Sequence, residues 1–540
     1  MKKKNFDPDN YNKLNNLRSK VIKDVSKFVD MNNKKILEVG TGTGDFSKLL
    51  SKKYKNSYIY GIDIVPQYIE SSQKNNTFSN LLFETKNIYD IDSTYDVVFM
   101  LFSLTELLKN NVLEKILNEI NKKILCDGYL VIVDEFTDDY TEKCDLIGIE
   151  VMQELGYKYL DYNDFKKELI KSEFELVFTK IYENKQKMVD AFGAKLQIFY
   201  ENKLNEFDNT KKYDSELIWK KMEEKIKNAN GIRTYNKSRL VVLKHKNNII
   251  TKLSNQKSNL CLYYSLHNIK NNIKYYKDLK IKNLEYIFPV KTFPNSKVLD
   301  LFYNSGFYYD VSNKNEENLV KKYKNLIFYS DPTNKLKNNN AIRLYVNNLG
   351  SHFGFTYDGG SYAIYHIHIS LNKSKNIQKK ILKIISHLDY SKTKYLDIGG
   401  SYDSLSYLEL YFLLKEIRNI VPRNVKILIE AGSMWFKNSG FLISKVEYIN
   451  LINQTRFVYV NASRELHTKW SIPKYINTNI GNNDYIICGS TCYEKDLFSH
   501  VYNTDIKSGA RIYFGEIEPY SYSFNISFNG IEKAEVIIDE

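Results

Sequence analysis

The sequence predicts an α/β protein with two α/β domains followed by an all-β domain. Short apolar runs of strand length alternate with helical patterns through most of the chain, which is typical of parallel sheets covered by helices. Beyond residue 433 the helical patterns stop and β-rich runs follow one another. The length of 540 residues agrees, because a chain of this length usually folds into about three or four domains.

The first domain is expected over residues 1–246 as a Rossmann-like, doubly wound sheet. Its strand-like runs are KKILEVG, SYIYGIDI, YDVVFML, GYLVIVDEF, FELVFTKIY and SRLVVLKHK. A charged segment of helical pattern, residues 184–236, precedes the last run and predicts an insert, either a lid or a substrate-recognition element. Residues 247–259 are polar and lack periodicity, so a linker is expected there.

The second domain is expected over residues 260–432 as a TIM-type α/β barrel, and the β domain over residues 433–540. The expected barrel strands are LEYIFPVK, GFYYDVS, LIFYSDP, AIRLYVN, AIYHIHIS, YLDIGG and VKILIEAG. Only eight residues separate SDP from AIRLYVN, which is too few for the strand and helix that a barrel needs there. The barrel is therefore expected to be shortened by about one βα unit.

Composition and charge exclude several classes of protein. The chain is 43% hydrophobic and 26% charged, so it can bury sizeable cores and is not a disordered protein. No apolar run is long enough to span a membrane, and no apolar segment follows the basic start, so a cytoplasmic protein is expected. The formal charge of +14 comes mainly from evenly spread Lys and predicts no dedicated nucleic-acid surface. The five Cys are scattered, so neither a disulfide framework nor a metal site is expected.

The first motif is a glycine loop at the end of the first strand. It reads EVGTGTG and contains Glu38, Gly40, Gly42 and Gly44. Glycines let the backbone turn sharply and approach a ligand, and open α/β sheets bind ligands at the carboxyl ends of their strands. Asp63 closes the second strand, where an acidic residue of such folds receives ribose hydroxyls. The alternative is an NAD-binding turn, but the G-x-G-x-G spacing differs from its G-x-G-x-x-G fingerprint.

Together with the KNIYD segment and the run YDVVFMLFSLTEL, this loop resembles the class I S-adenosylmethionine-dependent methyltransferases over about residues 30–180. The resemblance implies S-adenosylmethionine as a cofactor. It implies that the loop glycines pass the methionyl part, that Asp63 holds the ribose, and that Asn87 and Ile88 flank the adenine. Glu38 is counted with these cofactor-binding residues. Transfer from a sulfonium needs mainly positioning, so no catalytic residue is predicted for this domain.

A second set of motifs runs through the second half. In order, they are VKTFPNSKVLDLFYNSGFYYDVS, HIHIS, YLDIGGS, ILIEAGS, CGSTCYEKD and EPYSYSFNISFNG. Lys291 ends the strand LEYIFPVK, on the face where α/β barrels carry their chemistry. This order resembles the fold-type III pyridoxal phosphate-dependent decarboxylases, the ornithine and diaminopimelate decarboxylase family, over about 270 residues.

The resemblance implies pyridoxal 5'-phosphate as a second cofactor, attached to Lys291. His368 would stack on its ring, and Glu430 would contact the pyridine nitrogen. Decarboxylation needs a strong electron sink, and a carboxylate at that nitrogen keeps the ring protonated. Cys492 would reach the site from the partner subunit of a homodimer and donate a proton, the alternative being a small structural residue. The supporting residues implied for the cofactor are Asp310, Glu316, Arg343, Gly399, Gly400 and Tyr520.

Some positions depart from the family pattern. Ser433 stands where an Arg would grip the phosphate, and Tyr493 stands where an acidic residue would meet a distal amine. Tyr493 therefore predicts a substrate with an apolar or stacking distal group, with Asp496 as a further polar contact. His366, on the same side of its strand as His368, is interpreted as structural. The shortened barrel leaves open the alternative of a catalytically inactive scaffold.

The fusion suggests consecutive steps on one product. S-adenosylmethionine can donate a 3-amino-3-carboxypropyl group, which creates the α-amino acid that a decarboxylase consumes. This pairing resembles the aminopropylation steps of microcin C-type peptide-nucleotide antibiotics, and it predicts a small-molecule or nucleotide-peptide substrate. The alternative is methyl transfer joined to decarboxylation of an amino acid in siderophore, polyamine or other small-molecule biosynthesis.

Overall fold

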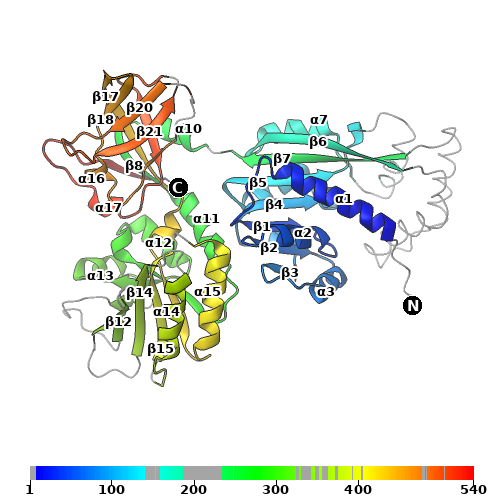
Figure 1. Cartoon of the computed structure of the whole chain (residues 1–540), viewed down its shortest axis with the longest axis horizontal. Helices are drawn as coiled ribbons and strands as arrows, with labels where there is room; N and C mark the ends of the chain where they lie inside the picture. The colour runs from blue at the N-terminus through cyan, green and yellow to red at the C-terminus, as the bar shows by residue number, and fades with distance from the viewer. Residues whose placement is uncertain are drawn as a thin grey trace. The chain divides into compact units, whose positions relative to one another are not determined.

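The computed structural model divides into two compact units, Met1–Lys246 and Asn247–Glu540, which are described separately (Figure 1). It describes residues 8–139, 153, 158–186, 234–246, 248–323, 327–329, 342–346, 352–355, 363–370, 375–391, 393–402, 405–476, 481, 483–503 and 505–539. Among these residues, no helix is long and apolar enough to cross a membrane.

The first unit is built on a seven-stranded sheet in the order β3-β2-β1-β4-β5-β7-β6. The strands are β1 (Lys35–Val39), β2 (Tyr58–Asp63), β3 (Leu81–Thr85), β4 (Tyr95–Leu101), β5 (Ile124–Asp134), β6 (Phe174–Gln186) and β7 (Thr234–His245). The first five run parallel, which confirms the doubly wound sheet, and β1 and β2 are buried at every position, as expected for strands covered on both faces. β7 runs antiparallel between β5 and β6.

The segment 184–236, expected as an insert, is described only at its two ends. Its ends are strand residues, because Gln186 on β6 pairs with Thr234 on β7. The ladder between these strands extends into the charged segment, where the helical pattern had suggested otherwise. Residues 187–233 lie outside the described residues.

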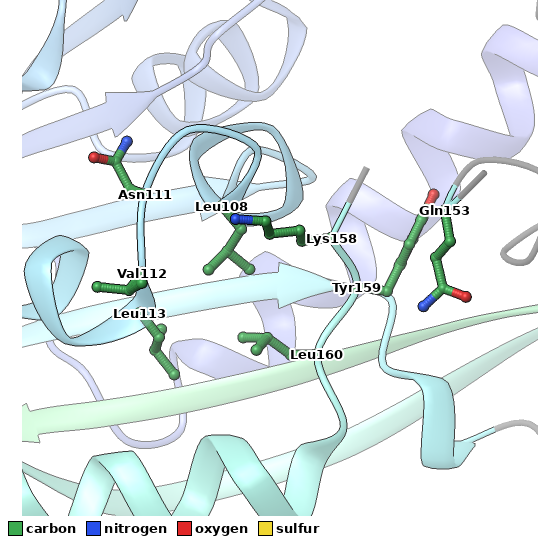
Figure 2. Close-up of a pocket in the computed structure, with 8 residues that line it drawn as sticks. All are labelled: Leu108, Asn111, Val112, Leu113, Gln153, Lys158, Tyr159 and Leu160. Atoms are coloured by element: carbon green, nitrogen blue, oxygen red, sulfur yellow. The ribbon is translucent and has the colours of Figure 1, made fainter. Parts of the chain in front are cut away.

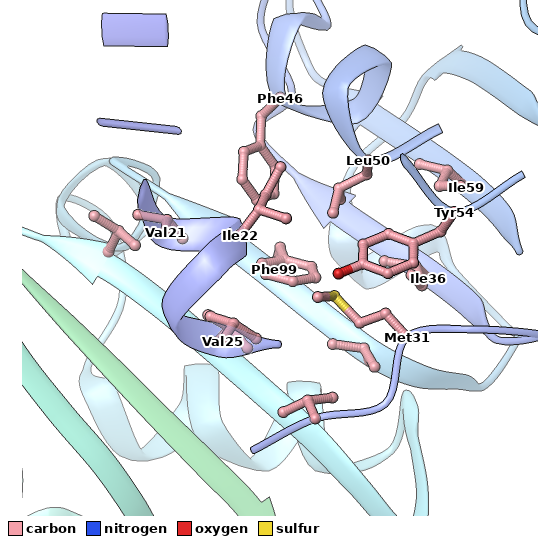
Figure 3. Packing of buried hydrophobic residues seen from close by; sticks show 14 of the residues in the cluster. Val21, Ile22, Val25, Met31, Ile36, Phe46, Leu50, Tyr54, Ile59 and Phe99 are labelled. Carbon is pink, nitrogen blue, oxygen red and sulfur yellow. The ribbon is translucent and has the colours of Figure 1, made fainter. Parts of the chain in front are cut away.

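Helices cover the sheet of the first unit. They are α1 (Pro8–Val25), α2 (Asp45–Lys53), α3 (Pro66–Lys74), α4 (Leu104–Leu108), α5 (Leu113–Asn121) and α7 (Tyr162–Lys171). Val21, Ile22 and Val25 form the apolar face of α1 and are fully or almost fully buried. They join a core that includes Phe46 of α2 and Phe99 of β4 (Figure 3). The two Phe rings meet edge to face at 5.1 Å, so α2 is fixed against the strands that carry the glycine loop.

The second unit contains a half-barrel sheet in the order β11-β10-β9-β16-β15-β14-β12-β13. Its strands are β9 (Leu284–Pro289), β10 (Tyr308–Val311), β11 (Ile327–Tyr329), β12 (Ile342–Val346), β13 (His352–Phe355), β14 (Ala363–Ser370), β15 (Thr393–Ser401) and β16 (Lys426–Glu430). All neighbours pair in parallel except β12 and β13. β9 pairs with β16, as the first and last strands of a barrel do. No described pairing joins β11 to β12, where the sequence predicts a missing unit.

Helices alternate with the strands of the half-barrel. They are α11 (Leu266–Lys277), α12 (Ser296–Asn304), α13 (Lys314–Val320), α14 (Lys375–Ser386) and α15 (Tyr407–Ile420). The N-terminus of α15 carries a complete capping box, in which Ser406 and Glu409 satisfy each other's backbone N–H groups. Helix α15 therefore begins where its sequence specifies.

The β domain is a second sheet of the same unit. Its strands are β8 (Leu260–Ser265), β17 (Gly440–Ile452), β18 (Thr455–Val460), β19 (Lys474–Tyr475), β20 (Asn483–Cys488), β21 (Leu497–Asn503), β22 (Arg511–Gly515) and β23 (Glu535–Asp539). Two four-residue helices, α16 (Arg464–His467) and α17 (Ser521–Phe524), interrupt the run of strands, whereas the sequence predicts none.

The structure differs from two expectations for residues 247–265. Residues 260–265, expected in the barrel, form β8, which pairs with β17 and β23 of the β domain. The expected linker 247–259 contains α10 (Ile249–Ser254). Ile249 and Leu253 of this helix are buried in one apolar cluster with strands of the β domain. The pair of apolar residues four positions apart is too short a pattern to distinguish from a polar linker.

Candidate functional site

The glycine loop joins β1 to α2 in the first unit. Gly40, Gly42 and Gly44 have φ angles of 74°, 54° and 78°, which favour glycine. A Cβ on Gly40 would lie 2.7 Å from the Cβ of Ser103, and one on Gly44 would strike the ring of Phe83. Within 4 Å of a Cβ on Gly42 there is no atom. The loop is thus closely packed at Gly40 and Gly44 and open at Gly42, where a ligand could lie against the backbone.

Asp63 ties this loop to the end of β2. Its Oδ2 accepts a 2.8 Å hydrogen bond from the N–H of Gly42, and its Oδ1 accepts one of 3.0 Å from Val65. Burial raises the pKa of the Asp63 carboxyl. β1 lies between β2 and β4, at the point where the strand order reverses, and open α/β sheets bind ligands outside the carboxyl ends of the strands there. Asp63 is therefore in a position to receive hydroxyl groups of a ligand.

Glu38 lies beneath the loop and is almost fully buried. Its Oε2 accepts hydrogen bonds from the hydroxyls of Thr41, at 2.8 Å, and Ser47. Burial raises the pKa of Glu38 to about 7. Glu38 thus braces the loop and the start of α2, and its direct contact with a cofactor stays a prediction.

Asn87 and Ile88, the residues expected to flank the adenine, lie at the turn after β3. Asn87 begins the 3-10 helix η1 (Ile88–Asp90), and its side chain accepts a hydrogen bond from the N–H of Tyr89. Ile88 is buried in the unit. The exposed apolar side chains near these strand ends are Ile64, 61% exposed, with Tyr89 and Phe102, 41% and 37% exposed. Sequence reasoning missed them, although Ile64 directly follows the Asp63 that closes β2.

A pocket of about 480 Å³ lies farther along α4. α4 begins beside Ser103, which contacts Gly40, and Leu108 at its end lines the pocket. Figure 2 shows the lining side chains, which come from the end of α4, the start of α5 and the segment before α7. They are Leu108, Asn111, Val112, Leu113, Gln153, Lys158, Tyr159 and Leu160. The short helix α4, of five residues, thus joins the segment beside the loop to the pocket.

In the second unit, strand register brings predicted residues to one edge of the half-barrel. Glu430 on β16 lies opposite Ile287 on β9 and Gly399 on β15. His368 on β14 lies opposite Gly399 in turn. Lys291 follows β9 in the 3-10 helix η4 (Val290–Thr292). The carboxyl ends of these parallel strands therefore share one edge, and Gly400, with a φ of 143°, extends it. The side chain of His368 lies outside the described residues.

The carboxyl group of Glu316 on α13 lies in the field of both Asp310 and Lys291. Asp310 on β10 is almost fully buried. Glu316 on α13 accepts hydrogen bonds of 2.7 Å from the N–H of Ser312 and from Asn313 Nδ2. Burial raises the pKa of Glu316, the negative charge of Asp310 raises it further, and the positive charge of Lys291 opposes both. The support of a cofactor on Lys291 by Asp310 and Glu316 stays a prediction.

Tyr520 brings the β domain to the same edge. Thr292, next to Lys291, donates a 3.2 Å hydrogen bond from its hydroxyl to the hydroxyl of Tyr520. Ser523 donates one of 3.4 Å to the carbonyl of Lys291. Ser433, where an Arg was expected, begins the 3-10 helix η5 (Ser433–Phe436). Pyridoxal phosphate needs a lysine for attachment, backbone N–H groups for its phosphate and a carboxylate for its ring nitrogen. Lys291, the backbone after Gly399 and Glu430 offer these groups, so the residues fit this cofactor.

Glu430 is part of a buried cluster that sequence reasoning missed. Its Oε2 lies 3.3 Å from Nδ1 of His366, and the same nitrogen lies 2.5 Å from Asp397 Oδ2. His366, interpreted from the sequence as structural, thus contacts the carboxylate expected at the cofactor ring. The signal was present, since Asp397 and Gly399 alternate onto one face of β15. Arg343 on β12 lies opposite His366, but its side chain is outside the described residues.

The loop after β20 carries the residues expected to face a substrate. Cys492 is exposed, and Tyr493 is 53% exposed. Asp496, the expected polar contact, is instead 2% exposed. Its carboxylate accepts hydrogen bonds from the N–H of Arg464 at 2.6 Å and from the N–H and hydroxyl of Thr491 at 3.1 and 2.5 Å. Asp496 therefore holds the loop through Arg464 and Thr491, and its contact with a substrate stays a prediction.

The strand order and glycine loop define the first unit as an α/β domain of the kind that binds a nucleoside-containing cofactor. Residues 30–207 match the family model described as a methyltransferase domain. The release factor glutamine methyltransferase of Flavobacterium psychrophilum is 26% identical over 181 residues, which are 32% of this chain and 60% of that protein. The chain thus spans less than two thirds of that relative.

Solved structures of decarboxylases are similar to about half of the chain. The arginine decarboxylase of Paramecium bursaria Chlorella virus is 15% identical, with a TM-score of 0.45, over 54% of this chain and 99% of its own. The lysine/ornithine decarboxylase of Vibrio vulnificus complexed with putrescine is 13% identical, with a TM-score of 0.43, over 54% and 97%. The carboxynorspermidine decarboxylase of Campylobacter jejuni complexed with norspermidine is 14% identical, with a TM-score of 0.41, over 52% and 94%.

Proposed function

We propose that this chain is a bifunctional biosynthetic enzyme that installs an aminopropyl group. One unit would transfer the 3-amino-3-carboxypropyl group of S-adenosylmethionine to an acceptor, and the other would decarboxylate the attached α-amino acid with pyridoxal phosphate. The observation that carries the proposal is the presence, in one chain, of a methyltransferase domain with its glycine loop and of a half-barrel edge bearing Lys291 and Glu430. The first product would be the substrate class of the second step.

The first step needs positioning more than a reacting side chain. The open backbone at Gly42 and the carboxylate of Asp63 would hold the methionyl part and the ribose. A nucleophile of the acceptor attacks the carbon next to the sulfonium, the carbon–sulfur bond breaks, and methylthioadenosine leaves. The acceptor loses one proton to solvent. An acceptor could approach through the pocket at the end of α4.

The second step exchanges a carboxyl group for a proton. Pyridoxal phosphate, when bound, supplies the electron sink that stabilises the carbanion. Lys291 would attach it, Glu430 would hold its ring nitrogen, and the N–H groups at Gly399 and Gly400 would bind its phosphate. Carbon dioxide leaves, and Cys492 of a partner subunit would protonate the same carbon.

The exposed Tyr493 supports an acceptor with a stacking group. A nucleotide-linked peptide, as in a microcin C-like antibiotic pathway, has such a group. A homodimer follows from the proposed role of Cys492. Sedimentation of a monomer that still decarboxylates would contradict that role.

A second candidate function is methyl transfer followed by decarboxylation of an amino acid, in siderophore, polyamine or other small-molecule biosynthesis. The matched family model and the curated relative, both described as methyltransferases, favour it. The sulfur by-product separates the two. The chain is incubated with S-adenosylmethionine and a panel of nucleotides and nucleotide-linked peptides. Methylthioadenosine supports aminopropylation, and S-adenosylhomocysteine supports methylation.

The alternative of an inactive second unit has its own test. Pyridoxal phosphate bound to a lysine absorbs visible light, so the full chain should show such a band after loading. Lys291→Ala should remove the band, with Lys297→Ala, on exposed α12 surface, as the matched control. An unsubstituted chain without the band would support the scaffold alternative.

A further inference from the structure

The strongest unassigned feature is the cluster of His366, Asp397 and Glu430, on the adjacent strands β14, β15 and β16. The three side chains are 2%, 0% and 5% exposed. One nitrogen, His366 Nδ1, faces both carboxylates, at 2.5 Å from Asp397 and 3.3 Å from Glu430. The ligand atoms of all three lie within 4.8 Å of one another. Such a concentration of ionisable groups is costly to bury without a chemical purpose.

The distances assign different roles to the two carboxylates. The single proton on His366 Nδ1 points to Asp397, which is the nearer acceptor. A carboxylate at this distance holds the imidazole in one tautomer and favours its charged form. Glu430, at the longer distance, is close enough to feel the imidazolium charge, and a carboxylate can accept from more than one donor.

The charges of the cluster favour a cationic donor. With both carboxylates ionised and His366 protonated, the three groups carry a net charge of −1, so they attract one further positive group. Tyr402, which feels the charges of Asp397 and Glu430, directs its hydroxyl to the carbonyl of Ile398. Glu430 also lies in register with Gly399 and Ile287, at the edge where Lys291 follows β9. A positively charged group of a ligand would therefore approach the cluster from the edge of the half-barrel that carries Lys291.

We propose that Asp397 and His366 are positioning residues that keep Glu430 ionised and aimed at the protonated ring nitrogen of the cofactor. The inference rests on the proposed binding of pyridoxal phosphate. Asp397 accepts a hydrogen bond from the imidazolium of His366, and the positive charge of the imidazolium stabilises the ionised form of Glu430. The three side chains act as a unit. Without His366 and Asp397, burial would favour the protonated form of Glu430, which could not form an ion pair with the protonated ring nitrogen.

The test compares pyridoxal phosphate with its 1-deaza analogue, in which a carbon replaces the ring nitrogen. Dissociation constants of both are measured on the full chain by quenching of protein fluorescence. The unsubstituted chain should prefer pyridoxal phosphate by about tenfold or more, the size of one charge-assisted hydrogen bond. In His366→Asn and Asp397→Asn the preference should fall to about twofold or less, as it should in Glu430→Gln.

Control variants come from an exposed pair of the same kind. His500 Nε2 contacts Asp484 Oδ1 on neighbouring strands of the β domain, and His500 is 56% exposed. His500→Asn and Asp484→Asn should keep the full preference. Retained binding of the deaza analogue shows that each variant is folded at the site, because both compounds share the aldehyde and the phosphate.

Four outcomes would overturn the inference. If Glu430→Gln loses the preference while His366→Asn and Asp397→Asn keep it, Glu430 acts alone. If the unsubstituted chain binds both compounds equally, the cluster does not contact the ring nitrogen, although cofactor binding stands. If neither compound binds, the proposed function itself fails. Tight binding of Zn²⁺ or Mn²⁺ that is lost in His366→Asn and blocks the preference would make the cluster a metal site.

Discussion

The backbone N–H of Gly42 donates a 2.8 Å hydrogen bond to the carboxylate of Asp63. This contact joins the loop after β1 to the end of β2, at the point where the strand order of the first sheet reverses. Asp63 therefore has two tasks, because the carboxylate that would hold a ribose also shapes the glycine loop. Loss of this side chain should impair the cofactor site more than loss of a single ligand contact.

Asp63→Ala should weaken binding of S-adenosylmethionine by about tenfold to a hundredfold, which corresponds to about 1.5–3 kcal/mol for hydrogen bonds to a charged group. Titration calorimetry on the full chain measures it. Glu70→Ala, at an exposed position of α3, is the control and should leave the affinity unchanged. An affinity in Asp63→Ala equal to that of the control would refute the assignment.

Substitutions of two loop glycines should have different costs. Gly40→Ala places a Cβ 2.7 Å from that of Ser103 at a φ of 74°, so strain and overpacking should lower the free energy of unfolding of the first unit by about 2–4 kcal/mol. Gly42→Ala meets no atom within 4 Å, so only the φ of 54° should cost, about 1 kcal/mol. Urea denaturation measures both. Equal losses would contradict the packing of Gly40 on Ser103.

Glu38 should make the stability of the first unit depend on pH. Its pKa rises from 4.5 to about 7 on folding, so between these values the folded state holds a proton that the unfolded state has released. The free energy of unfolding should therefore fall as pH rises from about 4.5 to 7 and stay lower above. Glu38→Gln lacks this dependence, and its stability relative to the unsubstituted chain should rise by about 3 kcal/mol across the window. Parallel pH profiles of the two proteins would show that Glu38 ionises normally.

Asp496 should determine the order of the loop that presents Cys492. In Asp496→Ala the N–H groups of Arg464 and Thr491 lose their acceptor, so their hydrogen exchange should become at least about tenfold faster. Asp505→Ala, at an exposed position of the β domain, should leave these rates unchanged. Rates that stay slow in Asp496→Ala would mean that other contacts hold the loop.

Much of the fold could be predicted from the sequence, because its signals are local. The run at β1, KILEV, is mostly apolar, and the three loop glycines recur at alternate positions. The boundary near residue 260 could not be predicted in the same way. The run LCLYYS of β8 suits either sheet of the second unit, and its pairing with β17 depends on residues about 180 positions later in the chain.

In the candidate site, too, features with a local sequence signal could be predicted, and features that depend on distant residues could not. Lys291, Gly399 and Glu430 sit at strand ends that alternation alone can place on one edge. The choice between His366 and His368 depends on which carboxylates the neighbouring strands bring alongside, and this is set by the register of β14 against β15. The burial of Asp496 depends on a turn of its own loop, for which a one-dimensional pattern has no signal.

The central claim is that the amino acid decarboxylated by this chain comes from S-adenosylmethionine itself. The most direct measurement uses S-adenosylmethionine labelled with ¹⁴C at the carboxyl carbon, incubated with the loaded full chain and the nucleotide panel. Aminopropylation predicts labelled carbon dioxide, formed in step with methylthioadenosine and lost in Lys291→Ala. Label that stays entirely in S-adenosylhomocysteine while the acceptor is modified would contradict the claim.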